Sequence, residues 1–400
     1  MSKVWVGLLM SLTLAAGCVQ SDRDALHSEE RDSAGVTIVT YDPIAFADLP
    51  RWVVSEAPMV DIGSNIDADP RYELFRVESI DELSTGEIVV LNAGTLDVRV
   101  YDAAGQYVQS VGRGGSGPGE FGQPRWLLAI AGDTIVVYDH NLRRLTFFSR
   151  NGELGRTVDV AEAAPGHRAA LGVLQTGSLL IPFASDFPPS MTGGLSRDSV
   201  TLQRISLTGE RLPPFGTYPG MEMYWLVDGN RVMGNALEFG KSLAVAAGDS
   251  LIYLGTTDQW EIQVRDHSGN LHRILRVSAK PRPVTRSMIE AFLSQPPDAE
   301  GDSAILAQQV ALRQAMPFPE TSPAFCQLAV DDAENLWVRS YPVHPDSNPD
   351  WHVFTAEGRL LAGVRLPERV DVRIISNGRI IGLYKDELAI EHVRVYELHR

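Results

Sequence analysis

The 400-residue sequence contains little cysteine, no excess of positive charge and no apolar run long enough to cross a membrane. It has two cysteines, and its 51 acidic residues outnumber 35 basic ones, which gives a formal net charge of −16. Nucleic-acid binding depends on a basic surface, so no nucleic-acid partner is expected. The G-x-S-x-G motif that presents a nucleophilic serine is also absent.

The N-terminus has the pattern of an export signal. One lysine, Lys3, precedes an uncharged apolar run over residues 4–16, and small residues then lead to Cys18. The stretch Leu-Ala-Ala-Gly-Cys at 14–18 resembles the bacterial lipobox, which implies a signal peptide over 1–17 and an acyl chain on Cys18. An ordinary secretory signal is the alternative. Valine rather than aspartate follows Cys18. The resemblance therefore implies a lipoprotein anchored to the outer membrane, on either the periplasmic or the surface face of that membrane.

The residues after the expected cleavage site are polar and highly charged. We predict a flexible tether over 18–33, followed by one folded region over 34–400. The second cysteine, Cys326, lies in an apolar stretch that is typical of a strand, so we interpret it as a small buried side chain.

A first repeated unit consists of a turn followed by an apolar strand, and it occurs six times. The copies lie at 85–92, 131–139, 176–183, 247–255, 333–341 and 377–384. A second unit, a strand, a tight glycine turn and a strand, occurs five times, at 100–112, 147–160, 204–216, 264–277 and 353–366. The two units alternate, which indicates four-stranded antiparallel sheets repeated along the chain.

The sixth repeat stops at its third strand, over 391–400. The segment 51–64 resembles the missing fourth strand, and its pairing with 391–398 would close a ring without a long open edge. We therefore predict an all-β fold, a six-bladed β-propeller of four-stranded antiparallel blades closed by the N-terminal strand. A linear solenoid is the alternative, but nothing in the sequence caps its ends.

The stretches at 72–121, 260–276 and 328–341 are similar to those of the NHL-type and related six-bladed propeller proteins of bacteria. Many of those proteins are exported lipoproteins. The resemblance implies the fold over about residues 50–400 but no particular chemistry, because propellers include binding modules and enzymes.

The glycine-rich stretch GRGGSGPGEFGQP at 112–124 satisfies G-x-G-x-x-G. A Rossmann fingerprint opens a helix, and a Walker loop ends in Lys-Ser/Thr, whereas Pro118 and Gly119 follow here and the next segment is a strand. We therefore predict a loop between blades, not a phosphate site.

The long connections all fall on one face of the predicted propeller. They are 183–200, 216–241, 278–324 and 341–351, and the third holds two predicted helices within about 283–316. This helical insertion is predicted either as a packed cap or as a mobile lid. Because insertions collect on the binding side of repeat folds, we predict a non-catalytic module that binds an envelope protein, peptide or glycan there, as a monomer.

The candidate ligand-binding side chains on this face are Arg113, Glu120, Arg125, Asp139, His140, Arg143, His344 and Trp351. The alternative function is a metal-assisted hydrolase or lactonase, as in some propeller enzymes, with calcium as the expected cation. Its candidate ligands are Asn92, Asp139, Asp346 and Asp386. No two of these stand at a spacing that specifies a metal, so no cofactor and no catalytic residue is predicted.

Overall fold

Almost all regular structure in the protein is β-strand. The computed structural model describes residues 28–47, 49–63, 69–163, 172–174, 177–185, 193–229, 231–295, 303–342 and 347–400. The two α-helices in these ranges are α2 (Arg286–Ser294) and α3 (Ser303–Ala315), and neither is long and apolar enough to cross a membrane. The predicted all-β class with a small helical insertion is confirmed.

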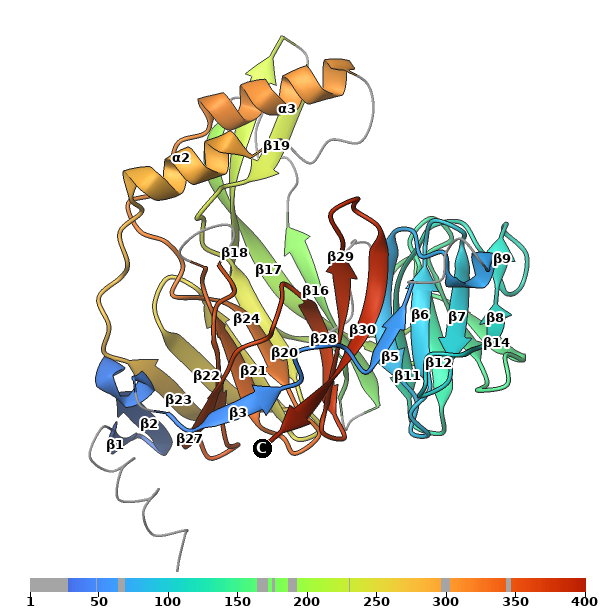
Figure 1. Ribbon diagram of the computed structural model, residues 1–400, viewed down its shortest axis with the longest axis horizontal. Coiled ribbons are helices and arrows are strands. Elements are labelled where there is room, and N and C mark those ends of the chain that lie inside the picture. The colour runs from blue at the N-terminus through green and yellow to red at the C-terminus, as the bar shows by residue number, and fades with distance from the viewer. Residues whose placement is uncertain are drawn as a thin grey trace, which may run out of the picture.

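The strands form antiparallel sheets that follow one another along the chain (Figure 1). The first sheet contains β5 (Val77–Glu82), β6 (Ile88–Asn92), β7 (Asp97–Tyr101) and β8 (Tyr107–Val111). The second contains β11 (Pro124–Ile130), β12 (Thr134–Asp139), β13 (Arg144–Phe148) and β14 (Leu154–Asp159). The third contains β15 (Gly172–Val173), β16 (Ser178–Ser185), β17 (Gly194–Ser206), β18 (Arg211–Asp228) and β19 (Arg231–Ala236).

Three further groups of strands follow the same order. The fourth contains β20 (Leu243–Ala247), β21 (Leu251–Thr256), β22 (Glu261–Asp266) and β23 (Leu271–Val277). The fifth contains β24 (Phe325–Val330), β25 (Leu336–Ser340), β26 (Trp351–Phe354) and β27 (Leu360–Val364). The last contains β28 (Asp371–Ser376), β29 (Arg379–Lys385) and β30 (Glu391–His399), with β4 (Val60–Ile62) from the other end of the chain.

Tight turns at glycines join the third and fourth strands, as the sequence predicts. Gly105 and Gly358 have φ angles of 80° and 84°, a region that residues with a Cβ avoid. At Gly358 a Cβ would also lie 2.4 Å from Cδ2 of Leu275 in the neighbouring sheet. Glycine there allows close packing between sheets as well as the turn.

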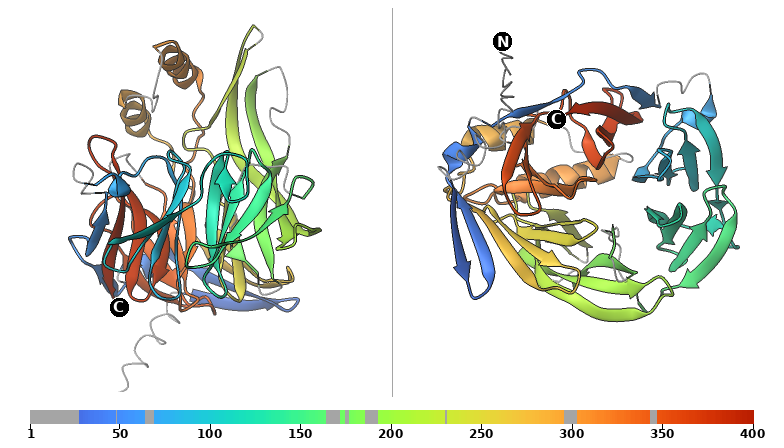
Figure 2. Two further views of the ribbon diagram at one scale, coloured as in Figure 1. Left: turned by 90° about the vertical axis from the view of Figure 1, so that its right-hand side faces the viewer. Right: turned by 90° about the horizontal axis from the view of Figure 1, so that it is seen from below.

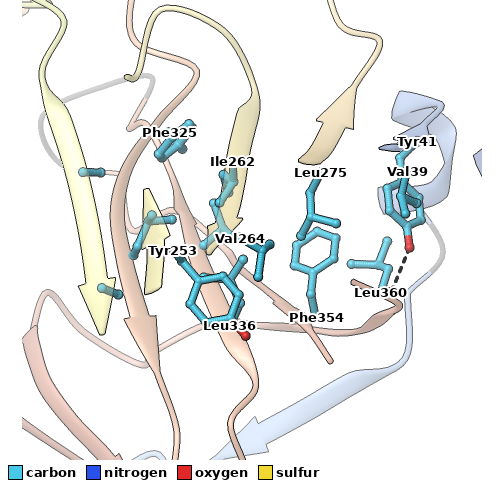
Figure 3. Packing of buried hydrophobic residues seen from close by; sticks show 14 residues of the cluster. Val39, Tyr41, Tyr253, Ile262, Val264, Leu275, Phe325, Leu336, Phe354 and Leu360 are labelled. Atoms are coloured by element: carbon cyan, nitrogen blue, oxygen red, sulfur yellow. Dashed lines mark hydrogen bonds between the residues drawn. The ribbon is translucent and has the colours of Figure 1, made fainter. Parts of the chain in front are cut away.

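Each hydrophobic cluster among the described residues lies between two consecutive sheets. Val89 and Leu127 belong to a cluster shared by the first two sheets, and Figure 3 shows the one between the fourth and fifth, with Leu275 and Phe354. A further cluster joins the last sheet to the first, through Ile62, Val393 and other residues. Figure 2 accordingly shows the sheets succeeding one another around a common centre.

The N-terminal segment pairs with the last strands, as expected for residues 51–64. Strand β4 lies antiparallel to β30, with Ile62 opposite Val393. The segment forms two strands rather than one, because β3 (Arg51–Val54) pairs in parallel with β27 and also with the end of β30.

The first described residues extend the fourth sheet, which the sequence did not predict. Strand β2 (Val36–Tyr41) pairs in parallel with β23, and β1 (Ser28–Ser33) pairs with β2. Residues 28–33 are thus not part of a flexible tether, and that part of the prediction is wrong. Backbone pairing holds β1 although nearly all of its residues are exposed. The predicted signal peptide and residues 18–27 lie outside the described residues.

The longest strands and the two helices lie at the same end of the molecule (Figures 1 and 2). Strands β17 and β18 span 13 and 18 residues and are paired from Gly194 with Trp225 to Ile205 with Arg211. Much of what the sequence predicted as connections at 183–200 and 216–241 is therefore strand. The hairpin expected around residue 229 is present, between β18 and β19.

Candidate functional site

A hollow of about 350 Å³ lies between the extended third sheet and the chain that leaves α3. We call it the insertion hollow. Its lining includes Leu195, Arg197, Glu222, Leu237, Phe318 and Pro319. These residues come from the segments that the sequence identified as long connections, but none of them was singled out as a candidate. The position of the insertions could be predicted, whereas the residues that line the hollow could not.

Strand pairing positions one wall of the hollow. Leu195 lies on β17 opposite Tyr224 of β18, and its side chain is 61% exposed. The backbone N–H of Leu237 donates to the carbonyl oxygen of Glu222 over 2.8 Å. A leucine exposed to this extent beside a second leucine and Phe318 gives the hollow an apolar surface that water solvates poorly.

An aromatic cluster fixes the opposite wall. The ring of Phe239, just after β19, lies 6.4 Å from Phe292 of α2 and 6.1 Å from Phe318. The guanidinium of Arg313 on α3 lies 4.1 Å from the ring centre of Phe292, and it donates to the carbonyl oxygens of Phe292 and Gln295 at the end of α2. Arg313 thus ties α3 to α2, and Phe292 ties α2 to Phe239 beside the third sheet. These contacts favour the packed cap over the mobile lid.

A buried lysine ties the returning chain to the sheet below. The backbone N–H of Lys241 donates to Oε2 of Glu222 over 2.7 Å, and its Nζ donates to the carbonyl oxygen of Thr321. Burial lowers the pKa of Lys241, because the charged form loses hydration. The carbonyl oxygen compensates part of that loss.

An ion pair stands at the edge of the hollow. Arg197 donates to both carboxylate oxygens of Asp258 over 2.8 and 2.7 Å, and its Nε donates to the carbonyl oxygen of Gly220. The hydrogen bond from Arg197 lowers the pKa of Asp258. This two-pronged geometry holds the arginine side chain in one orientation.

The glycine-rich stretch forms a fixed loop between the first two sheets, as the sequence predicted. Within it β9 (Arg113–Gly114) pairs with β10 (Glu120–Phe121), and the side chains of Arg113 and Glu120 form an ion pair of 2.9 Å. The N–H of Gly117 and then Arg113 lower the pKa of Glu120. Arg144, which the sequence did not single out, donates to the carbonyl oxygens of Ser116, Gly117 and Glu120.

Asp139 and Asn92 are fully buried at the ends of their strands. Oδ2 of Asp139 accepts from the N–H groups of Gly122 and Gln123, and Oδ1 accepts from that of Leu142. Oδ1 of Asn92 likewise accepts from a backbone N–H, that of Phe75. Both side chains thus hold neighbouring loops in place, and their oxygens are already hydrogen-bonded.

The other candidates are dispersed. His140 and Arg143 lie in the turn beside Asp139, where Arg143 is exposed with a φ of 48°. Arg125 pairs with Glu78 of the first sheet over 3.1 Å. Trp351 was expected on the binding face, but it is 1% exposed in the core between the last two sheets. Its position on β26 turns the ring toward Trp337.

Asp386 lines a separate, broad hollow of about 660 Å³ on the last sheet. Its Oδ1 accepts from two backbone N–H groups, and its Oδ2 lies 3.8 Å from Nε2 of His392. Among the described residues, no three histidine, cysteine or acidic side chains are arranged to hold a metal ion. His344, Asp346 and Cys18 lie outside the described residues.

Comparison with known proteins gives a family match over the first two sheets. Residues 70–162 match the model of a family described as a 6-bladed beta-propeller. No curated protein matches the chain.

Solved structures of similar shape share little sequence with this chain. They include a candidate exported protein from Bacteroides fragilis, with a TM-score of 0.47, 11% identity, and coverage of 91% of this chain and 100% of that one. A member of the DUF4221 family from Bacteroides vulgatus has a TM-score of 0.45 and 10% identity, covering 88% and 98%.

A virginiamycin B lyase from Staphylococcus aureus has a TM-score of 0.41 and 7% identity, covering 82% and 97%. Similarity of this degree carries no argument about activity. The family match confirms the resemblance to six-bladed propeller proteins that the sequence indicated. The described residues form consecutive antiparallel sheets, and the first two of these sheets match the 6-bladed beta-propeller family.

Proposed function

We propose that the protein is a non-catalytic binding module of the cell envelope that holds an apolar side chain of a protein or peptide partner in the insertion hollow. The observation that carries the proposal is the exposed Leu195 beside Leu237 and Phe318, on the face where the long segments gather. Six sheets closed into one ring by β4 would supply a rigid base, which limits the ordering cost of binding.

The lining favours a peptide over a glycan. Glycans stack on exposed aromatic faces and need many polar groups, whereas the hollow offers mainly the carbons of leucine, proline and one phenylalanine, with one ion pair at its edge. A pocket of this kind suits an aliphatic or aromatic side chain, while the hydrogen-bonding groups at the edge suit a peptide backbone.

Binding can be measured with the mature chain and fluorescein-labelled peptides that differ only in a central leucine, phenylalanine or aspartate. We expect saturable binding of the leucine and phenylalanine peptides and about tenfold weaker binding of the aspartate peptide. Phe318→Ala should lower the affinity for the leucine and phenylalanine peptides by about tenfold, because it removes part of the apolar surface that they would cover.

The matched control is Leu154→Asp, because Leu154 is an exposed leucine on the second sheet, away from the hollow. It should leave peptide binding unchanged. Equal binding of leucine and aspartate peptides, or an unchanged affinity in Phe318→Ala, would contradict the proposal. Preferential binding of an oligosaccharide panel would move the proposal to a glycan ligand.

Export and acylation at Cys18 are part of the same proposal and rest on the N-terminal sequence. A stable acyl anchor would keep the protein at a membrane without a transmembrane helix. Labelling of growing cells with an alkyne fatty acid should tag the wild type and leave Cys18→Ser untagged. An untagged wild type, exported and cleaved, would support the ordinary secretory signal instead. The metal-assisted hydrolase stays a prediction that no set of described residues supports.

A further inference from the structure

A second cavity, of about 480 Å³, lies where the N-terminal segment crosses the fourth and fifth sheets. We call it the strap cavity, because residues 40–46 run across one side of it. Its lining includes Phe46, Trp260, Arg276, Lys280, Arg282 and His352. None of these residues was a candidate from the sequence, and the cavity is separate from the insertion hollow.

One side of the strap cavity is an aromatic wall. The ring of Phe46 lies 4.7 Å from that of His352, edge to face, and 6.0 Å from that of Trp260. Behind them, Phe354 lies 5.5 Å from Trp260 and belongs to the core cluster of Figure 3. Packing against the core fixes the rings before any ligand arrives, so a flat apolar group would lose little freedom in the protein on binding.

The charges on the rim do not cancel. The two carboxylates of the lining are already paired, Glu261 with Arg276 over 2.6 Å and Asp258 with Arg197 over 2.7 Å. Lys280 and Arg282 form no ion pair with any described residue, and the guanidinium of Arg282 donates to the carbonyl oxygen of Tyr341. The rim therefore carries two cations that no described carboxylate neutralises, in a chain whose formal charge is −16.

The half-buried imidazole of His352 adds polarity rather than charge. Burial lowers the pKa of His352 to about 4, so the ring is neutral near pH 7. Its Nδ1 lies 3.4 Å from the hydroxyl of Ser340. A neutral ring of this kind can form a hydrogen bond to a ligand without repelling a cationic or an anionic group.

We propose that the strap cavity binds a small monocarboxylate with an aromatic body, whose ring packs on Phe46 and Trp260 and whose carboxylate lies between Lys280 and Arg282. The two halves of such a ligand match the two features of the cavity, the apolar wall and the uncompensated positive rim. A neutral aromatic ligand would leave the cations unused, and an anion without a ring would leave the wall uncovered.

Isothermal titration of the mature chain with 3-phenylpropionate tests the proposal, with 3-phenylpropanamide and propionate as matched ligands. We expect saturable binding of 3-phenylpropionate, weakened at high salt, and about tenfold weaker binding of either comparison ligand. The double variant Lys280→Ala, Arg282→Gln should lower the affinity for 3-phenylpropionate by about tenfold, and Trp260→Leu should lower the affinity for both aromatic ligands.

Arg286→Gln is the control, since Arg286 is a highly exposed cation a few residues away on α2. It should bind 3-phenylpropionate as the wild type does. Three results would overturn the proposal: amide and carboxylate binding with equal affinity, the double variant binding as tightly as the wild type, or no saturable binding of 3-phenylpropionate.

Discussion

The carboxylate of Asp61 lies 2.7 Å from Nδ1 of His392, although 331 positions separate the two residues in the chain. The second oxygen of Asp61 accepts from Nε of Arg394 over 2.9 Å. Asp61 lies on β4, while its two partners lie on β30, so one side chain from the N-terminal segment holds the last strand at two points. These partly buried contacts reinforce the backbone pairing of the two strands.

Asp61→Asn should lower the free energy of unfolding by about 2 kcal/mol, because the amide keeps one acceptor but removes the charge that faces Arg394 and His392. Urea unfolding followed by tryptophan fluorescence measures this change. Glu290→Gln is the matched control: its partner Arg286 is also an arginine, but both side chains are largely exposed. That substitution should change stability by about 0.5 kcal/mol or less. Equal effects of the two variants would show that the Asp61 contacts do not stabilise the pairing.

Asp139→Ala should lower stability by about 2 kcal/mol, since three backbone N–H groups would lose their acceptor in a buried site. Asp102→Ala, at an exposed turn where the carboxylate accepts from the backbone N–H groups of Ala104 and Gln106, should lower stability less.

The melting temperature of the wild type should not change when EDTA is added or when calcium follows. A large saturable rise with calcium, absent in Asp139→Ala, would instead assign Asp139 to a metal site and favour the hydrolase.

His352 predicts a pH dependence of stability. Its pKa is lowered from 6.5 to about 4 in the folded protein, so between these pH values the unfolded chain binds the proton more readily. The free energy of unfolding should therefore fall as the pH decreases from 6.5 to 4, with no penalty above 6.5. His352→Gln should reduce this slope in urea unfolding between about pH 7 and about pH 4.5. His399→Gln, at an exposed position, should leave the pH dependence of stability unchanged. An unchanged slope in His352→Gln would show that His352 is not its source.

Arg144→Met should loosen the glycine-rich loop without unfolding the protein, because three carbonyl oxygens would lose a charged donor while the aliphatic stem is kept. We expect faster hydrogen exchange of the backbone amides over residues 112–122 and a stability loss of about 1 kcal/mol. Arg143→Met is the matched control, since the neighbouring arginine is exposed. The same exchange rates in both variants would mean that Arg144 does not hold the loop.

The repeated units of the sequence predicted the sheets well because each depends on neighbours a few residues apart. The turn at Gly105 and the helix that begins after Thr285 are both present. Alternating apolar residues, a positive φ and a capping hydroxyl are local properties, so one chain can reveal them.

The remaining features depend on partners that the local sequence does not specify. Strand β18 contains Pro213, Pro214 and Pro219, which favour a loop, yet it pairs with β17 over most of its length. The strand β1 has no apolar pattern at all and is ordered by β2. At the edge of the insertion hollow, Arg197 pairs with Asp258, which lies 61 positions away in the chain. No spacing in the sequence indicates that pair.

The pairing of β4 with β30 has a consequence for synthesis of the chain. Ile62 is completely buried only because Val393 and its neighbours cover it. Ribosomes add roughly 5 to 20 residues each second, so the 331 positions between Asp61 and His392 correspond to roughly 17 to 66 s of elongation. During that interval Ile62 lacks the β30 residues that cover it in the folded protein, so its apolar side chain stays open to other contacts.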